Sequence, residues 1–381
     1  MIRRIIAFAV IVFGSFVLLI LCSRKGKDTW EIQHYPENMY YPWKDKRDYN
    51  EICNKMKAYM NQNHAKPIII YGSTGGLGHK FICASHGVSV AIAGKRPVKF
   101  FLPHNFWSVV NPCFNDRFDG SIEGLPVCSR QQPCLNETNR VIDVQNQLKN
   151  EELVYIDFRP PNILVINSTI VADLKRAEIL QPGDSFFDYN HILFRLMVNP
   201  SKSFRKIILD ESTRMFQKRP VLGVQIRAAG LLADAKESVS FIDEEALEKV
   251  PSIILDTIRQ FNFDKTIQGI YLSTDSKIVE NFLQEILGTD FPILKTDMYK
   301  RGHSTGSPKE DVVKRALLDV YMLAECDGLL TTQGSGFGGI AQALSLSPLR
   351  ATIPVQRKKV IVPGRGHKWY VCLNQLMGSE P

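Results

Sequence analysis

The sequence predicts an α/β protein of two domains, each built on a parallel sheet. In the C-terminal half, apolar runs of strand length alternate with stretches of helical length. Strands that alternate with helices in this way form parallel sheets. In the N-terminal half, an apolar strand, a helix of small residues and a second strand follow one another as a βαβ unit. A chain of 381 residues, 44% of them hydrophobic, is long enough for two such domains.

The N-terminal half has its clearest strand at 67–71, where Pro-Ile-Ile-Ile-Tyr is almost wholly apolar. A glycine-rich loop interrupts this run before the helix begins. The segment 105–150 contains Pro and Cys, shows no periodicity, and is expected to be a surface insertion. The elements expected in this half are strands at 67–71, 98–102, 154–158 and 163–166, and helices at 80–93, 189–198 and 204–218.

The C-terminal half alternates more regularly, which indicates a doubly wound sheet. Its expected elements are strands at 222–226, 269–273, 329–331 and 351–355, and helices at 244–261, 276–287, 312–326 and 337–344. The resulting organisation is a tail at 1–4, a membrane anchor at 5–22, a stem at 23–65, an N-terminal domain at 66–215 and a C-terminal domain at 216–381.

The anchor is predicted from an almost continuous apolar run at 5–22. As a helix it is about 27 Å long, enough for a thin bilayer. A cleaved signal peptide is the alternative, but no small-x-small cleavage site follows Leu21. Basic residues flank both ends of this helix, so their distribution barely indicates which end faces the cytoplasm. Two glycosylation sequons, at Asn136 and Asn167, favour a luminal body.

Charge and cysteine content limit the class of ligand. The net charge is +8, but no Lys/Arg run with interleaved aromatic residues appears, so we expect no nucleic-acid partner. A basic groove for an anionic nucleotide is the simpler interpretation. The cluster Cys113, Cys128 and Cys134 lacks nearby histidines, which argues against zinc and allows one or two disulfides. Cys83 and Cys326 lie in apolar helical patterns and are expected to be buried.

A candidate phosphate site follows the strand at 329–331. There Gly334-Ser335-Gly336 leads into the helix that starts near Phe337. A strand that passes into a helix through small residues presents backbone N–H groups to a phosphate. A tight turn that simply requires glycine is the alternative.

Other strand ends add polar groups at the same predicted sheet edge. Arg227 follows the strand at 222–226, and its guanidinium suits a diphosphate, although a structural ion pair would also explain it. Gln225 lies on the same face of that strand. The next strand ends in Ser273, Thr274 and Asp275, which are expected to contact the nucleotide, and either Asp275 or Ser276 is expected to cap the helix that follows.

The loop Gly72-Ser-Thr-Gly-Gly-Leu-Gly78 supports a competing hypothesis, because it fits the dinucleotide loop of short-chain dehydrogenases. Such an enzyme would bind NAD(P). The acidic residue expected to bind a ribose is missing, since the second strand ends in Leu102-Pro103-His104.

Several of these motifs together resemble the α1,2-fucosyltransferase superfamily. Gly76-Leu-Gly-His-Lys80 and the strand from Lys95 to Leu102 look like the Gly-Leu-Gly-Asn-Arg loop and the strand after it. The segments Phe194–Pro200, Gly223–Arg227 and Ala316–Leu344 are most similar to the plant xyloglucan fucosyltransferase branch, which has Gln where relatives have the His of His-x-Arg-Arg. The sequence departs from the pattern at Ala228, where many relatives have a second arginine, and at His79-Lys80.

The resemblance implies a GT-B-like arrangement of two facing Rossmann-like domains, and inverting transfer of fucose from GDP-fucose to a glycan, at galactose O-2. By this match Arg227 would neutralise the diphosphate and Gln225 would help to position it. No Asp-x-Asp lies on a plausible cleft loop, so we expect no metal. The nucleotide would be held by Ser335, Gly336 and Phe337, and the cleft lined by Gly76, Gly78 and His79.

The general base is not identified by these motifs. Four side chains are candidates for taking the proton from the acceptor hydroxyl: His79, Asp184, Asp188 and His303.

The resemblance also implies a single-pass type II protein of the Golgi membrane. Because Ala228 replaces an arginine, a catalytically inactive glycan-binding homologue is a further alternative.

Overall fold

The structure is a computed structural model. It describes residues 47–71, 76–101, 109–110, 112–114, 121, 123–129, 151–156, 163–234, 239–260, 267–302, 309–345, 347, 350–355 and 358–359. The expected anchor at 5–22, the sequon at Asn136, and Cys134 and His303 lie outside these residues. In the part of the chain described, no helix is both long enough and apolar enough to cross a bilayer.

The N-terminal half is built on a four-stranded parallel sheet in the order β2-β1-β4-β3. Its strands are β1 (Ile68–Tyr71), β2 (Val98–Phe101), β3 (Val127–Cys128) and β4 (Leu153–Ile156). Helix α3 (Leu77–Gly94) connects β1 to β2, so the expected βαβ unit is confirmed. Helices α6 (Ile163–Arg176), α7 (Phe186–Met197) and α8 (Lys202–Phe216) follow.

The C-terminal half has a five-stranded parallel sheet in the order β10-β9-β5-β7-β8. The strands are β5 (Val221–Ile226), β7 (Gly269–Thr274), β8 (Ile293–Leu294), β9 (Gly328–Thr332) and β10 (Arg350–Ile353). The helices are α9 (Glu244–Gln260), α10 (Lys277–Leu287), α11 (Glu310–Ala324) and α12 (Gly336–Leu344). A short antiparallel pair, β6 (Val239–Ser240) with β11 (Lys358–Lys359), lies apart from this sheet. The doubly wound α/β arrangement is therefore confirmed.

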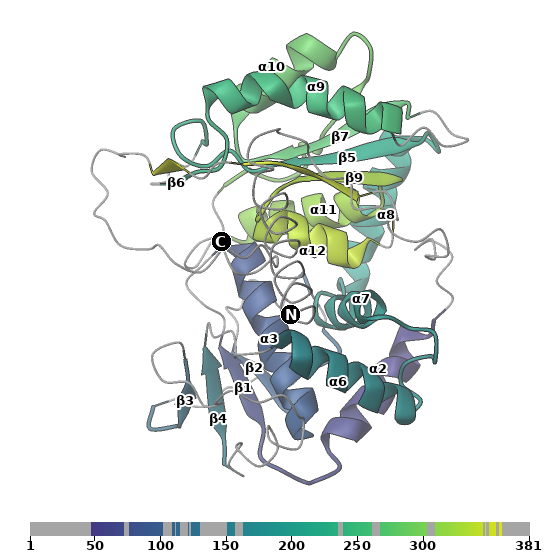
Figure 1. The fold of residues 1–381 in the computed structure, drawn as a ribbon, viewed down its shortest axis with the longest axis vertical. Coiled ribbons are helices and arrows are strands. Elements are labelled where there is room, and N and C mark those ends of the chain that lie inside the picture. The colour runs from purple at the N-terminus through teal and green to yellow at the C-terminus, as the bar shows by residue number, and fades with distance from the viewer. Residues whose placement is uncertain are drawn as a thin grey trace, which may run out of the picture.

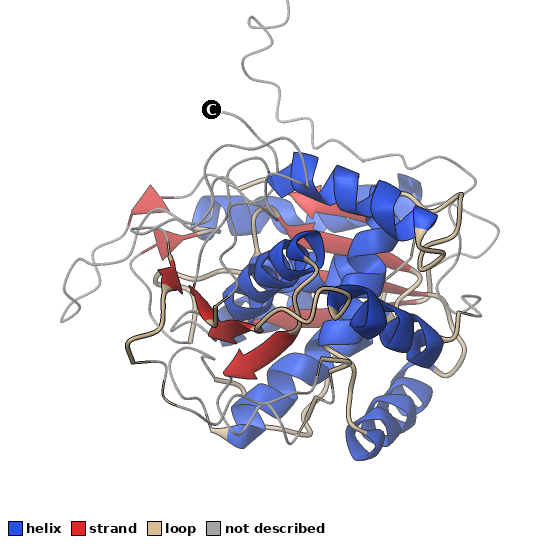
Figure 2. Ribbon diagram, turned by 90° about the horizontal axis from the view of Figure 1, so that it is seen from below, coloured by secondary structure: helices blue, strands red, loops and turns tan. Residues whose placement is uncertain are grey.

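The C-terminal sheet is covered on both faces (Figure 1). Leu222 and Val224 of β5 point to opposite sides from Val221 and Gly223 because side chains alternate along a strand. The even-numbered side chains pack in a core with α9 and α10, whereas Val221 belongs to the core that contains α11 and α12. In Figure 2 the strands likewise lie between helices.

The two halves share one continuous core. Buried side chains of α3 and α7 belong to the same cluster as those of α11 and α12. His191 of α7 lies 2.9 Å from the carbonyl oxygen of Ala343 in α12 through Nδ1, and 2.9 Å from the Tyr49 hydroxyl through Nε2. The imidazole is 2% exposed, so it connects the halves from within the core.

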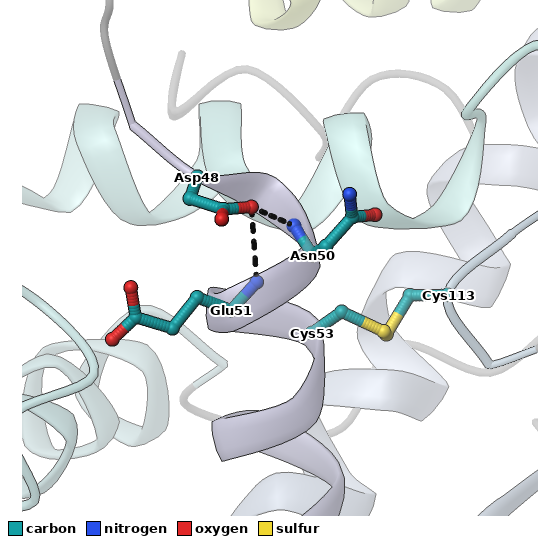
Figure 3. Close-up of a disulfide and its surroundings, with 5 residues drawn as sticks. All are labelled: Asp48, Asn50, Glu51, Cys53 and Cys113. Carbon is teal, nitrogen blue, oxygen red and sulfur yellow. Dashed lines mark hydrogen bonds between the residues drawn. A yellow bond between two sulfur atoms is a disulfide. The ribbon is translucent and has the colours of Figure 1, made fainter.

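Part of the segment expected to be a stem belongs to the N-terminal body. Helix α2 (Tyr49–Met60) is capped by Asp48, whose carboxylate accepts from the backbone N–H groups of Asn50 and Glu51. A disulfide joins Cys53 of this helix to Cys113, 60 residues away (Figure 3). Cys128 is disulfide-bonded as well. The disulfide at Cys113 therefore reaches outside the cysteine cluster, to a helix in the segment predicted to be the stem.

One secondary-structure prediction is wrong. Ile163–Ile166 is not a strand but the first part of α6. Its run of Ile, Leu and Val suits a strand locally, but Ile170, Val171 and Leu174 continue the apolar pattern at helical spacing and are buried. Asn167 in this helix is 6% exposed, so the folded protein has no room for a glycan at that sequon.

Candidate functional site

The strand order of the C-terminal sheet defines one crevice. β5 comes first in the chain but lies in the middle, and the chain then fills one side with β7 and β8 and the other with β9 and β10. The order therefore reverses between β5 and β9. In open parallel sheets, ligands bind outside the carboxyl ends of the strands at such a switch point.

Two of the predicted segments meet at this switch point. The backbone N–H of Arg227, directly after β5, donates to the Thr332 hydroxyl of β9 at 2.9 Å. The same hydroxyl donates to the carbonyl oxygen of Gln225 at 3.1 Å. Thr332 thus fixes the end of one strand to the other, and the Gly334-Ser335-Gly336 turn begins two residues later.

Helix α12 begins at this turn with its amino end at the crevice. Gly334 has φ of +69°, a left-handed conformation that glycine adopts without steric cost. Ser335 caps the helix, and its hydroxyl accepts from the Gly338 N–H at 3.4 Å. Because unpaired N–H groups and the helix dipole place positive charge at this end, it favours an anion.

Helix α3 of the other half brings a second amino end to the same place. It begins at Leu77 after the cap residue Gly76. A Cβ built on Gly78 would lie 2.5 Å from the carbonyl carbon of Gly336 and 2.5 Å from the Phe337 nitrogen. The backbones of the two helices therefore touch through Gly78 and Gly336. The predicted residues of the N-terminal half and of the C-terminal turn are brought together.

Gln225 lies beneath the first turn of α12. Its side chain is 3% exposed, and Oε1 has no hydrogen-bond partner among the described residues. A Cβ on Gly338 would come within 2.8 Å of this oxygen, so glycine leaves the space next to it open. Ser273 and Thr331 flank Gln225 on the neighbouring strands. An unpaired buried carbonyl oxygen is costly in a folded protein, so a hydrogen-bond donor on a ligand would stabilise Oε1.

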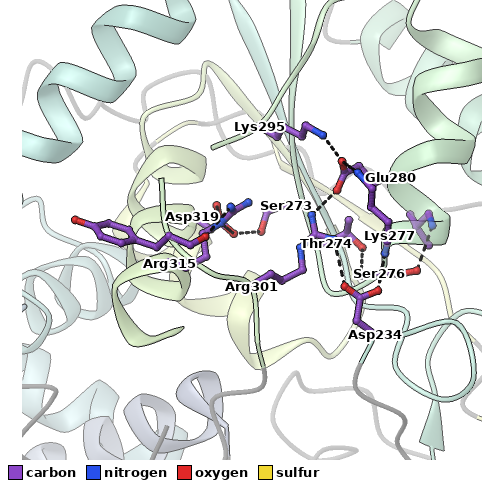
Figure 4. Close-up of polar contacts among 12 residues, drawn as sticks. Asp234, Ser273, Thr274, Ser276, Lys277, Glu280, Lys295, Arg301, Arg315 and Asp319 are labelled. Atoms are coloured by element: carbon purple, nitrogen blue, oxygen red, sulfur yellow. Dashed lines mark hydrogen bonds and ion pairs between the residues drawn. The ribbon is translucent and has the colours of Figure 1, made fainter. Parts of the chain in front are cut away.

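Ser273 is held by a buried network below the sheet edge (Figure 4). Its hydroxyl donates to the Asp319 carboxylate at 3.3 Å, and the Tyr271 hydroxyl donates to the same group at 2.7 Å. Arg315 contacts Asp319 through Nε at 3.1 Å. Burial raises the pKa of Asp319, although the Arg315 charge and the Tyr271 hydroxyl oppose this shift. Contact between Ser273 and a nucleotide stays a prediction.

Asp275 supports the loop that carries Arg227. Its carboxylate accepts from the N–H groups of Ala228 and Ala229 at 2.8 and 3.2 Å. It also forms an ion pair with the Arg227 guanidinium at 3.0 Å, with the two side chains 22% and 26% exposed. Ala229 has φ of +51°, so the loop is held in a conformation that alanine rarely adopts. Ala228 is fully buried rather than facing the crevice.

The neighbouring cap involves Ser276 rather than Asp275. The Ser276 hydroxyl accepts from the Val279 N–H at 3.1 Å, while the Thr274 hydroxyl accepts from the Ser276 N–H at 3.3 Å. Thr274 is partly buried at the same sheet edge. Its predicted contact with the nucleotide is not tested by these hydrogen bonds.

The candidate bases differ in their surroundings. His79, in the first turn of α3, is half-buried, and its ring lies 3.7 and 3.8 Å from the Cys83 sulfur. Asp184 is 6% exposed, accepts from the Gln181 N–H and pairs with Arg47 at 3.1 Å. Burial raises its pKa. Asp188 forms the capping box of α7 with Ser185. These contacts explain both aspartates structurally, and His79 is the candidate that lies beside the helix junction.

The sequence analysis missed a cluster of charges beside the crevice. Glu280 of α10 is 4% exposed. Its carboxylate forms an ion pair with the Lys277 ammonium at 2.6 Å, and also with Lys295 and Arg301 (Figure 4). Burial alone would raise the pKa of Glu280, but hydrogen bonds from the three cations lower it to about 2. Arg301 also pairs with Asp234 at 3.5 Å. Lys277 lies three residues before Glu280 on α10, but Lys295 and Arg301 follow 15 and 21 residues after it, outside that helix, so the sequence does not show that they meet.

Among the described residues, no cluster of three or more His, Cys, Asp or Glu side chains has the arrangement of a metal site. The polar groups at the crevice are instead a guanidinium, an amide, hydroxyls and helix amino ends.

The fold and the site define an α/β protein with two parallel sheets and a candidate anion-binding site at the carboxyl ends of β5 and β9. No protein-family model and no curated protein matches the sequence.

Solved structures with a similar backbone include three fucosyltransferases. NodZ α-1,6-fucosyltransferase soaked with GDP-fucose is 16% identical, with 74% of this chain and 93% of that chain covered and a TM-score of 0.44. A variant of Arabidopsis thaliana FUT1 in complex with GDP is 13% identical, with 78% and 75% covered and a TM-score of 0.48. POFUT1 in complex with GDP is 10% identical, with 76% and 98% covered and a TM-score of 0.44. Because these identities and TM-scores are low, the function is inferred from the residues of the site.

Proposed function

We propose that this protein is a metal-independent, inverting glycosyltransferase that moves L-fucose from GDP-fucose to a glycan hydroxyl, at galactose O-2. The observation that carries the proposal is the meeting of four groups at the β5/β9 switch point. These are the Arg227 guanidinium, the unpaired Gln225 amide, and the amino ends of α12 and α3. The guanidinium and the two helix amino ends suit a diphosphate, the unpaired Gln225 Oε1 suits a hydrogen-bond donor elsewhere on the nucleotide, and the sequence motifs that contain these groups resemble fucosyltransferases.

The proposed reaction places the developing charge on the departing nucleotide. The acceptor oxygen forms a bond to the fucose anomeric carbon from the face opposite GDP while the bond to the β-phosphate oxygen breaks. Preorganised positive groups stabilise the charge that GDP gains. Arg227, paired with Asp275, supplies a guanidinium, Gly336 and Phe337 supply backbone N–H groups, and Ser335 caps the helix that carries them. A permanent cation can do the work that a metal does in other transferases.

Asp275 has a positioning role in this proposal. Because it holds Arg227 and the loop from Ala228 to Ala229, the guanidinium is fixed before the donor arrives. Preorganisation of this kind is what makes an electrostatic group effective. His79 is proposed as the group that takes the acceptor's proton, since it lies in the α3 turn at the junction.

The location proposed for the enzyme is the Golgi lumen, with residues 5–22 as the anchor. The disulfide between Cys53 and Cys113 supports an oxidising compartment, because stable disulfides are rare in the cytosol.

The test measures nucleotide binding and turnover by the full chain. GDP and GDP-fucose in excess are expected to raise Tm by the equivalent of a few kcal/mol, whereas UDP and NAD⁺ are not. GDP-fucose hydrolysis or transfer should persist in EDTA. Arg227→Ala should lower it at least about tenfold, since a hydrogen bond to a charged group contributes about 1.5–3 kcal/mol.

Arg259→Ala is the matched control, because this arginine is an exposed helix residue paired with Asp256. Equal activity of both variants would reject the role of Arg227. A Tm shift with NAD⁺ alone would favour the dehydrogenase alternative. Nucleotide binding without any turnover would favour the inactive, glycan-binding homologue.

A further inference from the structure

Two aromatic rings stack at the carboxyl edge of the N-terminal sheet. Tyr71 is the last residue of β1 and Phe101 the last of β2, and the two are directly paired in the parallel register. Their ring centroids lie 5.3 Å apart with an angle of 24° between the planes. This is an offset-stacked geometry, which favours a stable, preformed pair.

The pair differs from the aromatic residues of the core. Phe100, one residue before Phe101, is 3% exposed and belongs to the main core cluster. Phe101 points to the other face and is 37% exposed, and Tyr71 is half-buried. A single exposed apolar residue needs no explanation. Here the rings are paired and stand at the edge of a parallel sheet where ligands bind.

The rings also lie near the candidate donor site. Tyr71 precedes Gly76, the cap of α3, by five residues, so their Cα atoms are at most roughly 18 Å apart. The α3 amino end in turn touches Gly336 of α12. In Figure 1 the arrowhead of β4 points toward the C-terminal half, and β1 and β2 run parallel to it. The rings therefore lie at the end of their sheet that faces the C-terminal half.

We propose that Tyr71 and Phe101 form a stacking platform for one pyranose ring of the acceptor glycan. This inference rests on the proposed function and names where that acceptor binds. The face of an aromatic ring is negative, and the C–H groups on one face of a pyranose are weakly positive and apolar, so the two attract. The Tyr71 hydroxyl adds a group that both donates and accepts hydrogen bonds, which suits a sugar hydroxyl.

A sugar of the acceptor fits the platform better than the base of the donor. In a doubly wound sheet the nucleotide lies along the carboxyl ends of its own strands. Those strands are β5 and β9, which belong to the C-terminal half. The platform belongs to the N-terminal half, so a sugar bound there does not overlap the proposed donor site. The geometry thus divides the two substrates between the two sheets.

The test compares Phe101→Ala with Phe101→Tyr in the full chain. Lactose and other galactose-terminated oligosaccharides serve as acceptor probes. Binding is read by saturation-transfer NMR and transfer from GDP-fucose by KM. Phe101→Ala is expected to weaken lactose binding at least about tenfold, with Phe101→Tyr close to the unchanged protein. GDP binding, read by its Tm shift, should stay within about twofold for both variants.

Phe187→Ala is the matched control, since Phe187 is 44% exposed and also lies beside another aromatic ring, Phe186, at 6.1 Å. It should leave lactose binding unchanged. Equal lactose binding by Phe101→Ala and the unchanged protein would overturn the platform. Two other results would also overturn it. One is an unchanged protein that binds GDP but none of the glycans, and the other is a Phe101→Ala variant that loses GDP binding rather than lactose binding. Failure of the unchanged protein to bind GDP would reject the proposed function separately.

Discussion

Gly78 of α3 and Gly336 of α12 are in backbone contact across the junction of the two halves. A Cβ on Gly78 would lie 2.5 Å from the Gly336 carbonyl carbon, and a Cβ on Gly336 would lie 3.3 Å from the Gly78 carbonyl carbon. Real Cβ atoms do not approach backbone so closely, so Gly78 in particular admits no side chain. The contact sets the spacing between the two helix amino ends.

We therefore expect Gly78→Ala to be destabilising and to impair nucleotide binding. The added methyl meets backbone atoms, which cannot rotate away, so the two helices must separate. Overpacking of this kind costs about 1–3 kcal/mol in free energy of unfolding. Thermal unfolding with and without GDP measures both effects.

Gly183→Ala is the control for this change, because a Cβ there has no atom within 4 Å. Its Tm and GDP shift should match those of the unchanged protein. A Gly78→Ala variant that behaved in the same way would show that the halves separate at no cost.

Gln225→Met is expected to separate stability from binding. The variant keeps the side-chain length but removes the buried Oε1, which has no partner among the described residues. Relief of an unpaired buried polar group is worth about 1–3 kcal/mol, so the nucleotide-free protein should be as stable as before or more stable. GDP affinity should fall, and calorimetric titration measures it.

Thr331→Val provides the opposite pattern. The Thr331 hydroxyl accepts from the Gln342 amide at 2.8 Å, so its loss leaves a partly buried donor unpaired. This variant should unfold more easily and bind GDP normally. If Gln225→Met lost stability and kept its affinity, the buried amide would be a structural group and not a ligand contact.

The sequence predicts an element well where the apolar pattern lies within that element alone. Strands β5, β7 and β9 and helices α10 to α12 lie within a few residues of their expected bounds, because buried strands and amphipathic helices have distinct periods. Ile163–Ile166 was assigned wrongly because a short apolar run fits either type. Helix α2 was missed because its burial depends on packing and a disulfide to a distant segment.

The candidate site shows the same limit. The glycines and Arg227 follow strands, so their common location could be predicted from topology alone. Ser273 is held by Asp319, 46 residues away, and Asp275 by the backbone of Ala228, 47 residues away. Such contacts depend on the tertiary fold, so they could not be predicted from spacing in the sequence. A signal was present in Arg315 and Asp319, which form an i, i+4 charged pair within the otherwise apolar stretch 315–324 of α11.

Loss of the Cys53–Cys113 disulfide should destabilise the N-terminal half. The bond closes a loop of 60 residues, and the chain-entropy model assigns roughly 4 kcal/mol to a loop of that length. We expect the double serine variant to unfold at lower denaturant concentration.

Cys83→Ser, which leaves the disulfide intact, should unfold at nearly the same denaturant concentration as the unchanged protein. Dithiothreitol should shift the unfolding midpoint of the unchanged protein more than that of the double serine variant. Equal shifts would mean that α2 is held by packing alone.

Glu280 is expected to make stability depend on acid pH. Its pKa in the folded protein is about 2, below the usual 4.5, because three cations donate to its carboxylate. A carboxyl with a lowered pKa stabilises the fold above its usual pKa and loses this contribution as pH falls to the folded value. The difference corresponds to at most about 3 kcal/mol at neutral pH, lost between about pH 5 and pH 2.

Glu280→Gln tests this dependence. The variant should be less stable than the unchanged protein at pH 7, and the gap should close as pH approaches 2 because the native carboxyl is then protonated as well. Glu245→Gln is the control, since Glu245 is 73% exposed and pairs only with Lys249 at the surface in the described structure. Exposed pairs contribute little, so its gap should stay near zero throughout. A Glu280→Gln gap that stayed constant with pH would mean that the three cations pack around the side chain without stabilising its charge.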